Sequence, residues 1–191
     1  MRTLIVTEFI SLDGIVDSPG GGEHPRAGWT FKDVDFVEEA YELKGREQTE
    51  AAAMLIGRQS YEEFAPVWPT MTEEFPQYNA MPKYVVSTTL DADEVANGPW
   101  ENCHVLRSLD EVAELKKGEG GPIIVHASAN LAQGLAAAGL VDQYNLLVFP
   151  VVLGGGKRLF AADGGEFAKL RLVEHDTYSN GIQKAVYSVE G

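Results

Sequence analysis

Short apolar segments rich in β-branched residues alternate with helix-forming segments along most of the chain, and this alternation limits the folds that are open to it. Strands that are separated by helices pair in parallel, so the order predicts an α/β fold with a mostly parallel, twisted sheet and flanking helices. The expected strands are 2–10, 52–56, 83–87, 104–106, 122–126 and 143–149, and the expected helices, with any capping residue, are 33–49, 58–67, 108–117 and 128–138.

The C-terminal part of the chain has a different pattern. Segments 170–178 and 182–189 are both rich in β-forming residues, and Ser179-Asn180-Gly181 separates them. An Asn-Gly pair between strands predicts a tight hairpin turn in which both residues have positive φ. The sheet is therefore expected to end in an antiparallel hairpin. No shift in composition marks a boundary within residues 1–191, so we expect a single domain.

Capping residues predict where the helices begin. Asp33 precedes one expected helix, and Ser128 precedes another. Ser108 and Glu111 have the spacing of a capping box. The stretch 11–32, between the first strand and the first helix, is rich in Gly, Pro and Asp. So long a loop inside a domain is usually functional or mobile.

Charge and composition argue against several classes of function. The 191 residues carry a formal net charge of −14 and one cysteine. An acidic chain argues against a nucleic-acid partner, since phosphate binding depends on Lys and Arg. The histidines lack metal-ligand spacing, and no segment approaches the roughly 20 apolar residues of a membrane helix. Together with the lack of a signal-peptide pattern, these features predict a cytoplasmic protein with no metal and no membrane partner.

Two segments near the ends of expected strands carry charged groups suited to ligand binding, because ligands of open α/β sheets bind beyond the carboxyl ends of the strands. In segment 11–14, the carboxylate of Asp13 follows the first strand. In segment 57–61, Gly57 permits a close turn, and Arg58 offers a planar guanidinium to a phosphate at a helix start. The alternatives are a plain Asp-Gly turn and a solvated arginine.

Two further segments have hydroxyls or small side chains. Segment 87–89 holds three hydroxyl residues, and segment 126–131 has small residues where a strand meets a helix, as a pyrophosphate site requires. The alternatives are a hydroxyl-rich turn and an ordinary capped helix in which His126 is a satisfied, half-buried histidine. Segment 154–157, Gly-Gly-Gly-Lys, lacks the spacing of a phosphate loop, so its glycines are expected to shape a turn.

Taken in order, these segments resemble the dihydrofolate reductase-like superfamily, with a closer likeness to the reductase domain of the bifunctional riboflavin-biosynthesis deaminase/reductase. The resemblance is to stand-alone members, since no deaminase half is present. It implies a three-layer α/β fold, NADPH as cofactor and a homodimer as the common assembly. The segments that carry it are 11–14, 55–62, 83–88, 128–131, 139–144 and 150–160.

The resemblance also implies roles for individual residues. Arg58 would meet the 2′-phosphate of NADPH, and Asp13 would lie near the nicotinamide and the substrate. Family members often have a small residue at the position of His126 in this chain. The larger side chain of His126 is a candidate for substrate contact. The implied cofactor-binding residues are Gly57, Arg58, Ser60, Ser87, Thr88, Ala127, Ser128, Ala129, Asn130 and Leu131, and the candidate substrate-binding residues are Trp29, Phe31, Tyr61 and His126.

The function that follows is a reductase that moves hydride from NADPH to a C=N or C=O carbon of a pteridine-like or ribosylaminopyrimidine-like molecule. Asp13 or water would supply the proton, and Trp29 and Phe31 would cover the substrate ring, with loop packing as the alternative. Two rival functions stay open. One is a non-catalytic, dimeric nucleotide-binding module, and the other is a true dihydrofolate reductase with Asp33 or Asp35 as its acid.

Overall fold

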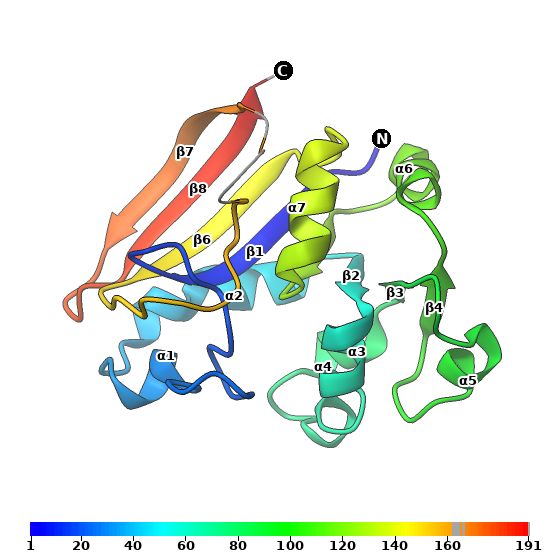
Figure 1. Ribbon diagram of the computed structural model, residues 1–191, viewed down its shortest axis with the longest axis horizontal. Helices are drawn as coiled ribbons and strands as arrows, with labels where there is room; N and C mark the ends of the chain where they lie inside the picture. Colours follow the sequence, from blue (N-terminus) through cyan, green and yellow to red (C-terminus); the bar gives the residue numbers. More distant parts are fainter. Residues whose placement is uncertain (162–164, 166, 191) are drawn as a thin grey trace.

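In the computed structural model, which describes residues 1–161, 165 and 167–190, eight strands form one sheet. The order across the sheet is β4-β3-β2-β5-β1-β6-β8-β7. Strands β1 to β6 are parallel, and β8 and β7 add an antiparallel hairpin beside β6 (Figure 1). The strands are β1 Leu4–Ser11, β2 Ala53–Gly57, β3 Lys83–Val86, β4 Cys103–Leu106, β5 Ile123–His126, β6 Gln143–Phe149, β7 Lys169–Thr177 and β8 Gln183–Glu190.

Helices cover both faces of this sheet, so the predicted α/β fold class is confirmed. Leu43 of α2 and Tyr61 of α3 are buried on one face, and Val112 of α6 and Leu135 of α7 on the other. In Figure 1, α7 lies in front of the sheet and α2 behind it. The helices are α1 Trp29–Lys32, α2 Glu38–Glu50, α3 Arg58–Phe64, α4 Pro76–Ala80, α5 Ala92–Ala96, α6 Leu109–Lys117 and α7 Ala129–Ala137, with a 3₁₀ turn at Trp68–Thr70.

The apolar runs of the central strands reflect burial on both faces. In β5, Ile123 and Val125 pack toward α6 and α7, whereas Ile124 packs toward the opposite face. Each predicted strand is found within two residues of its expected ends. Within the described residues, no helix is both long enough and apolar enough to cross a membrane.

Helix starts agree with the sequence only in part. The Ser108 hydroxyl accepts a hydrogen bond from the Glu111 N–H (3.2 Å), as the capping box predicts. The prediction that Asp33 caps a helix is wrong, because Asp33 ends α1 and α2 begins at Glu38. Ser128 precedes α7, but its hydroxyl makes no capping bond to that helix. Helices α4 and α5 were not expected from the sequence.

The hairpin between β7 and β8 turns differently from the prediction. Gly181 has a positive φ of 85°, but Asn180 does not, so the expected pair of left-handed residues is wrong. The Tyr178 carbonyl accepts from the Gly181 N–H (2.9 Å), and the Tyr178 N–H donates to the Ile182 carbonyl (3.0 Å). This is a three-residue loop in which only the last position requires glycine.

Strand β7 contains a one-residue bulge. Leu172 pairs with Tyr187 and Glu174 pairs with Val186, so Val173 has no partner on β8. An extra residue in one strand exchanges the faces of all side chains that follow it. Glu174 therefore lies on the α2 side of the sheet, although it is two residues beyond Leu172, which lies on the α7 side with Tyr187.

Lys83, at the start of β3, is a fully buried lysine. Its ammonium group donates to the carbonyls of Tyr78 (3.3 Å), Asn79 (2.7 Å) and Met81 (3.0 Å) at the end of α4. It also lies 4.9 Å from the centroid of the Trp100 ring. Burial lowers the pKa of Lys83. The side chain thus closes the C-terminal end of a helix that is too short to be stable alone.

Replacement of Lys83 by methionine tests this role. The apolar stem is kept, but three carbonyls lose their donor, so we expect a loss of about 2–3 kcal/mol in the free energy of unfolding. Urea denaturation measures it. Lys117→Met is the matched control, because Lys117 is exposed and forms an exposed ion pair with Glu114, and it should change stability by less than about 0.5 kcal/mol. Equal losses in the two variants would contradict the assignment.

Candidate functional site

At the carboxyl edge of the sheet, β5 ends earlier than its neighbour β1. Pairing between β5 and β1 stops at His126 and Thr7, while β1 continues to Ser11. On its other side, β1 stays paired with β6 as far as Ser11 and Phe149. The chain after His126 therefore leaves β1 and enters α7 at this edge of the sheet.

The turn into α7 is strained. Ala127 and Ser128 have left-handed backbone conformations, with φ of 53° and 70°. Such conformations cost about 1–3 kcal/mol each in residues other than glycine and are concentrated at functional sites. The first amides of α7, those of Ala129, Asn130 and Leu131, donate no hydrogen bond to any residue that the structure describes. They are free to bind an anion.

Ser128 joins the start of α7 to that of α3. Its hydroxyl accepts a hydrogen bond from the Gly57 N–H (2.9 Å) and donates one to the Ser60 hydroxyl (2.7 Å). Gly57 has an ordinary extended conformation, and a Cβ built on it would lie 3.7 Å from Ser128 Oγ and 3.9 Å from Leu131 Cβ. Neither the backbone conformation nor the space within the protein requires glycine at position 57. The effect of the missing side chain is to leave open space between the starts of α3 and α7.

Arg58 lies at the edge of this junction. Its guanidinium donates to both carboxylate oxygens of Glu62, one turn along α3, at 3.1 Å. The two side chains are 53% and 47% exposed, so the pair contributes little to stability and is open to exchange. A phosphate group that approaches Arg58 competes with Glu62 for the same donors.

The residues after β3 divide into a structural hydroxyl and an exposed one. Ser87 is buried, and its hydroxyl accepts from the N–H groups of Thr89 (3.2 Å) and Leu90 (3.1 Å). The Arg107 guanidinium donates to the carbonyl of Ser87 (2.9 Å). Thr88 is exposed. The Ser87 hydroxyl therefore shapes the turn, and Thr88 is the hydroxyl that a ligand can reach.

Asp13 fixes the segment that follows β6. Its carboxylate accepts hydrogen bonds from the hydroxyl of Ser11 (2.6 Å) and from the N–H groups of Leu153 (3.1 Å) and Gly154 (2.8 Å). The Ser11 bond, followed by the two amide bonds, lowers the pKa of Asp13 to about 2. The carboxylate is ionised at neutral pH, where it cannot donate a proton. Its contacts suit it to positioning.

Residues 153–158, which we call the rim segment, connect the Asp13 turn with both helix starts. The Lys157 ammonium donates to the side-chain oxygen of Gln59 on α3 (2.9 Å), and Gln133 of α7 donates to the Arg158 carbonyl (2.8 Å). The Arg158 guanidinium donates to the Asp13 carbonyl (2.8 Å). Two of the three glycines of the rim segment have positive φ, in agreement with the turn that the sequence predicts.

The four candidate substrate residues are not all at this edge. Trp29 is fully buried, with its ring 5.3 Å from that of Phe149, so the alternative of loop packing holds for it. Tyr61 is 8% exposed and belongs to the core beneath α3. Phe31 is 61% exposed, on a short helix of the long loop. His126, the last residue of β5, is partly exposed, and it is the one of these four candidates that lies at the carboxyl edge of the sheet.

The two candidate acids of a dihydrofolate reductase lie in the loop before α2. Asp33 and Asp35 are both exposed. Asp33 lines, with Arg26 and residues 151–153, a hollow of about 280 Å³ beside the rim segment. Neither carboxylate belongs to the face of α2 that packs on the sheet.

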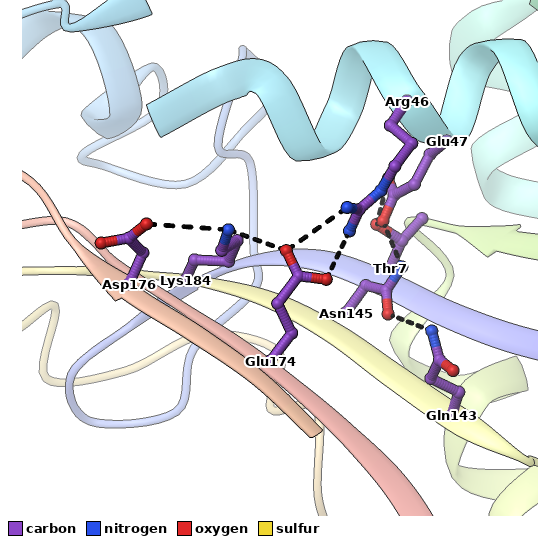
Figure 2. A network of polar contacts seen from close by, with 8 residues as sticks. All are labelled: Thr7, Arg46, Glu47, Gln143, Asn145, Glu174, Asp176 and Lys184. Atoms are coloured by element: carbon purple, nitrogen blue, oxygen red, sulfur yellow. Dashed lines mark hydrogen bonds and ion pairs between the residues drawn. The ribbon is translucent and has the colours of Figure 1, made fainter. Parts of the chain in front are cut away.

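Polar side chains that the sequence interpretation missed lie between α2 and the sheet. Glu47, buried in α2, accepts from the Thr7 hydroxyl (2.8 and 2.7 Å) and from the side-chain amide of Asn145 (2.7 Å) (Figure 2). Lys44 bonds to Thr7 and lies 3.3 Å from Glu47. We call these four residues the inner polar cluster. Its sequence signal is a threonine and an asparagine inside apolar strands, with Lys and Glu at helical spacing.

A second set of polar contacts lies closer to the hairpin. Arg46 donates to both oxygens of Glu174 (3.3 and 2.8 Å), which also pairs with Lys184 (2.8 Å) (Figure 2). A hollow of about 310 Å³ lies between the two sets and reaches the amino ends of β5 and β6. It is thus away from the helix starts at the carboxyl edge. No group of three or more metal-ligating side chains occurs among the residues described.

Glu8 is a further residue that the sequence interpretation did not single out. It is 4% exposed on the α7 side of β1, between Val6 and Ile10, and its Oε1 has no hydrogen-bond partner in the described part of the chain. Burial raises the pKa of Glu8 to about 8, with Lys44 opposing the shift and Glu47 adding to it. At neutral pH the side chain is therefore mostly a neutral acid.

Comparison with known proteins identifies the family. A family model described as the RibD C-terminal domain matches residues 2–184. The chain is also 29% identical, over 199 aligned positions, to the uncharacterised protein YyaP of Bacillus subtilis (strain 168), covering 100% of this chain and 96% of that protein.

Three solved structures share the fold. A candidate riboflavin biosynthesis protein from Shewanella sp. PV-4 has a TM-score of 0.71 at 18% identity and 99% coverage of both chains. A pyrimidine reductase-like protein from Corynebacterium diphtheriae has a TM-score of 0.60 at 14% identity, covering 99% of this chain and 92% of that one. Dihydrofolate reductase from Enterococcus faecalis, in complex with NADP(H) and RAB-propyl, has a TM-score of 0.58 at 14% identity, covering 99% of this chain and 97% of that one. At these identities the likeness shows the fold alone.

The buried acid at Glu8 predicts a specific pH dependence of stability. The folded protein keeps this proton up to about pH 8, whereas the unfolded chain loses it near 4.5, so stability falls as the pH rises from 4.5 towards 8. Glu8→Gln keeps a neutral side chain at all pH values. We expect it to exceed the wild type in stability by about 3 kcal/mol at pH 7 and to match it near pH 4.5.

Thermal denaturation between pH 4.5 and 8 measures this difference. Glu114→Gln, on the exposed surface of α6, is the control and should show no such trend. A difference between Glu8→Gln and the wild type that stays constant with pH would argue against the buried neutral acid.

Proposed function

We propose that this chain, which belongs to the RibD C-terminal domain family, is an NADPH-dependent reductase that transfers hydride to a C=N or C=O carbon of a small heterocyclic molecule. Family membership supports a reductase of this type. The observation that carries the cofactor proposal is the junction of α3 and α7, where the Gly57 N–H and the hydroxyls of Ser128 and Ser60 form one chain of hydrogen bonds.

The residues at this junction fit a dinucleotide. The first three amides of α7 bond to no residue in the described part of the chain, and the turn before the helix is strained. Small residues, among them Gly57 and Ala127, leave the backbone accessible to a pyrophosphate. Arg58 adds a guanidinium whose present partner, Glu62, is an exposed carboxylate. Together these groups offer dipoles and one displaceable cation to a ligand of high negative charge.

When bound, NADPH would supply the hydride from its nicotinamide ring. The start of α7, from Ala127 to Leu131, would hold the pyrophosphate, and Arg58 would hold the 2′-phosphate. Gly57 and Ser60 would flank the phosphates, and Thr88 would line the adenosine side, with Ser87 shaping the turn beneath it. The chain's contribution is to bind and orient the two reactants and to exclude water between them.

Asp13 takes a positioning role in this proposal. Because its pKa is about 2, it is an anion at the pH of the reaction and holds Leu153 and Gly154 of the rim segment by their amides. The proton that accompanies the hydride then comes from water or from another group at the edge. Phe31 and His126 stay candidates for substrate contact, whereas Trp29 and Tyr61 support the walls from within the core.

A pyrimidine-type substrate fits better than dihydrofolate. The acids that a dihydrofolate reductase would require, Asp33 and Asp35, are exposed in the loop before α2. On the inner face of α2, the carboxylate of Glu47 is already bound by Thr7 and Asn145. The homodimer and the cytoplasmic location remain predictions from the sequence.

Binding and turnover of NADPH test the proposal. NADPH at a hundredfold excess over its dissociation constant should stabilise the fold by about 2.7 kcal/mol in thermal denaturation. Gly57→Ala should fold normally, since an added Cβ meets only ordinary contacts, but should weaken the binding of NADPH because the methyl group fills the junction.

Oxidation of NADPH, followed with ribosylaminopyrimidines and with dihydrofolate, identifies the substrate. Binding without oxidation of NADPH by any of them would instead favour a nucleotide-binding module.

Arg58 and Glu62 should change cofactor preference in opposite directions. Arg58→Ala should weaken NADPH by tenfold or more and leave NADH nearly unchanged, which corresponds to about 1.4 kcal/mol for the 2′-phosphate contact. Glu62→Gln removes the competing carboxylate and should strengthen NADPH binding severalfold. Glu63→Gln, an exposed neighbour that bonds only to Gln59, is the control. Calorimetric titration measures the dissociation constants of both cofactors. Equal losses of affinity for NADPH and NADH in Arg58→Ala would refute this role.

A further inference from the structure

His126 has an enclosed ring nitrogen. Its Nδ1 is buried and forms no hydrogen bond within the described residues. The ring is held by contacts with the rings of Phe64, Trp68 and Tyr78, at centroid distances of 6.1, 5.3 and 5.7 Å. The residue as a whole is partly exposed, and Nε2, which also forms no hydrogen bond within the described residues, is not enclosed in the same way as Nδ1. A buried polar atom without a partner is energetically unfavourable and requires an explanation.

Two more enclosed polar atoms on adjacent elements also lack partners among the residues described. These are the hydroxyl of Tyr78, on α4, and the side-chain oxygen of Gln48, on α2. The two helices pack together, and the amide nitrogen of Gln48 donates to the Glu74 carbonyl just before α4 (3.3 Å). Three unsatisfied groups thus come from β5, α4 and α2.

The charged groups of α2 indicate that these atoms face one region. Burial lowers the pKa of His126 to about 3, and the ammonium of Lys44 contributes to this shift. Burial raises the pKa of Tyr78, and the carboxylate of Glu47 contributes. Geometry agrees, because Thr7, which pairs with His126 between β1 and β5, bonds to both Lys44 and Glu47, and the Tyr78 ring lies 5.7 Å from that of His126. Gln48 follows Glu47 on the inner side of α2.

Hydrogen bonding selects one form of the imidazole. A buried water typically makes about three hydrogen bonds. If it accepts from the Tyr78 hydroxyl and donates to Gln48 and to Nδ1 of His126, every hydrogen has an acceptor. If Nδ1 carries the proton instead, one hydrogen of the water or of Tyr78 is left unbonded. The complete arrangement requires the proton of His126 on Nε2.

We propose that an internal water joins Gln48, Tyr78 and His126, fixes His126 as the neutral Nε2–H tautomer, and makes that N–H the donor that recognises a carbonyl oxygen of the substrate. His126 lies where β5 leaves β1, one residue before the Ala127–Ser128 turn. Resting on the proposed function, this assigns an oxo-substituted heterocycle as the substrate class. Tyr78 acts through His126 and is a positioning residue.

Nitrogen NMR of the histidine-labelled full chain tests the tautomer without reference to activity. The chain has four histidines, and a His126→Asn sample assigns the signal of His126. We expect His126 to be in the Nε2–H form and not to titrate between pH 5 and 8. Tyr78→Phe keeps the ring but removes the hydroxyl, and should give a mixture of both tautomers. A His126 that is protonated in this range, or that carries its proton on Nδ1, would overturn the proposal.

Tyr84→Phe is the matched control. The ring of Tyr84 lies 5.7 Å from that of His104, the same centroid distance as between Tyr78 and His126. The substitution should leave the His126 signal unchanged. An equal effect of both substitutions on His126 would show a general structural response and would contradict the specific link through Tyr78.

The substrate class is tested with two small probes in the presence of NADP⁺. 5,6-Diaminouracil carries ring carbonyls, whereas 2,4,5,6-tetraaminopyrimidine has amino groups in their place. We expect the first to shift the Nε2–H signal of His126 and the second to leave it unchanged. The Nε2–H donor can bond to a carbonyl oxygen, whereas an amino group at the same position offers it another donor. A similar response to both probes, or none to either, refutes the recognition role. Failure to bind NADPH would refute the proposed function, while the tautomer measurement would still stand.

Discussion

Adjacency of β2 and β5 in the sheet is the constraint on which the site depends. Gly57 and Ser128 are 71 positions apart in the sequence, yet the two parallel strands bring the helices that follow them to the same edge. A hydroxyl then bonds the two helix starts to each other. Because the strands are apolar on both faces and cannot slip without exposing that surface, the spacing of the two starts is set by the core of the protein.

The strands and their parallel order follow directly from the sequence, because each apolar run must be buried and each connection is long enough for a crossover. The roles of single side chains do not. For Trp29 the sequence left substrate contact and loop packing both open, and in the structure its ring completes the core beside Phe149. Ser128 was expected to cap its own helix and instead bonds to α3, and Asn180 lacks the expected positive φ. These outcomes depend on neighbours that are remote in the sequence, which local patterns do not contain.

The two faces of the sheet near the end of β5 differ in how their polar groups are satisfied. Beneath α2, Thr7, Glu47 and Asn145 bond to one another. On the α7 face, the acid of Glu8 is enclosed among apolar residues. On the α2 face, next to the inner polar cluster, the Nδ1 of His126 has no partner in the described chain. Lys44 influences the pKa of both Glu8 and His126. Burial determines the protonation of both groups, and the ammonium of Lys44 opposes the shift of Glu8 but adds to that of His126.

The bulge at Val173 decides where the charges of β7 lie. Since it exchanges the faces of the residues that follow, Glu174 and Asp176 lie on the side of Lys184 and Arg46. Loss of Val173 alone would leave Glu174 directly after Leu172, on the face that it already occupies. Pairing of Val173 with Val186 in a regular strand would instead carry both carboxylates to the opposite surface and leave Arg46 and Lys184 without acidic partners. For this hairpin, the position that is left out of the ladder matters more than the length of the strand.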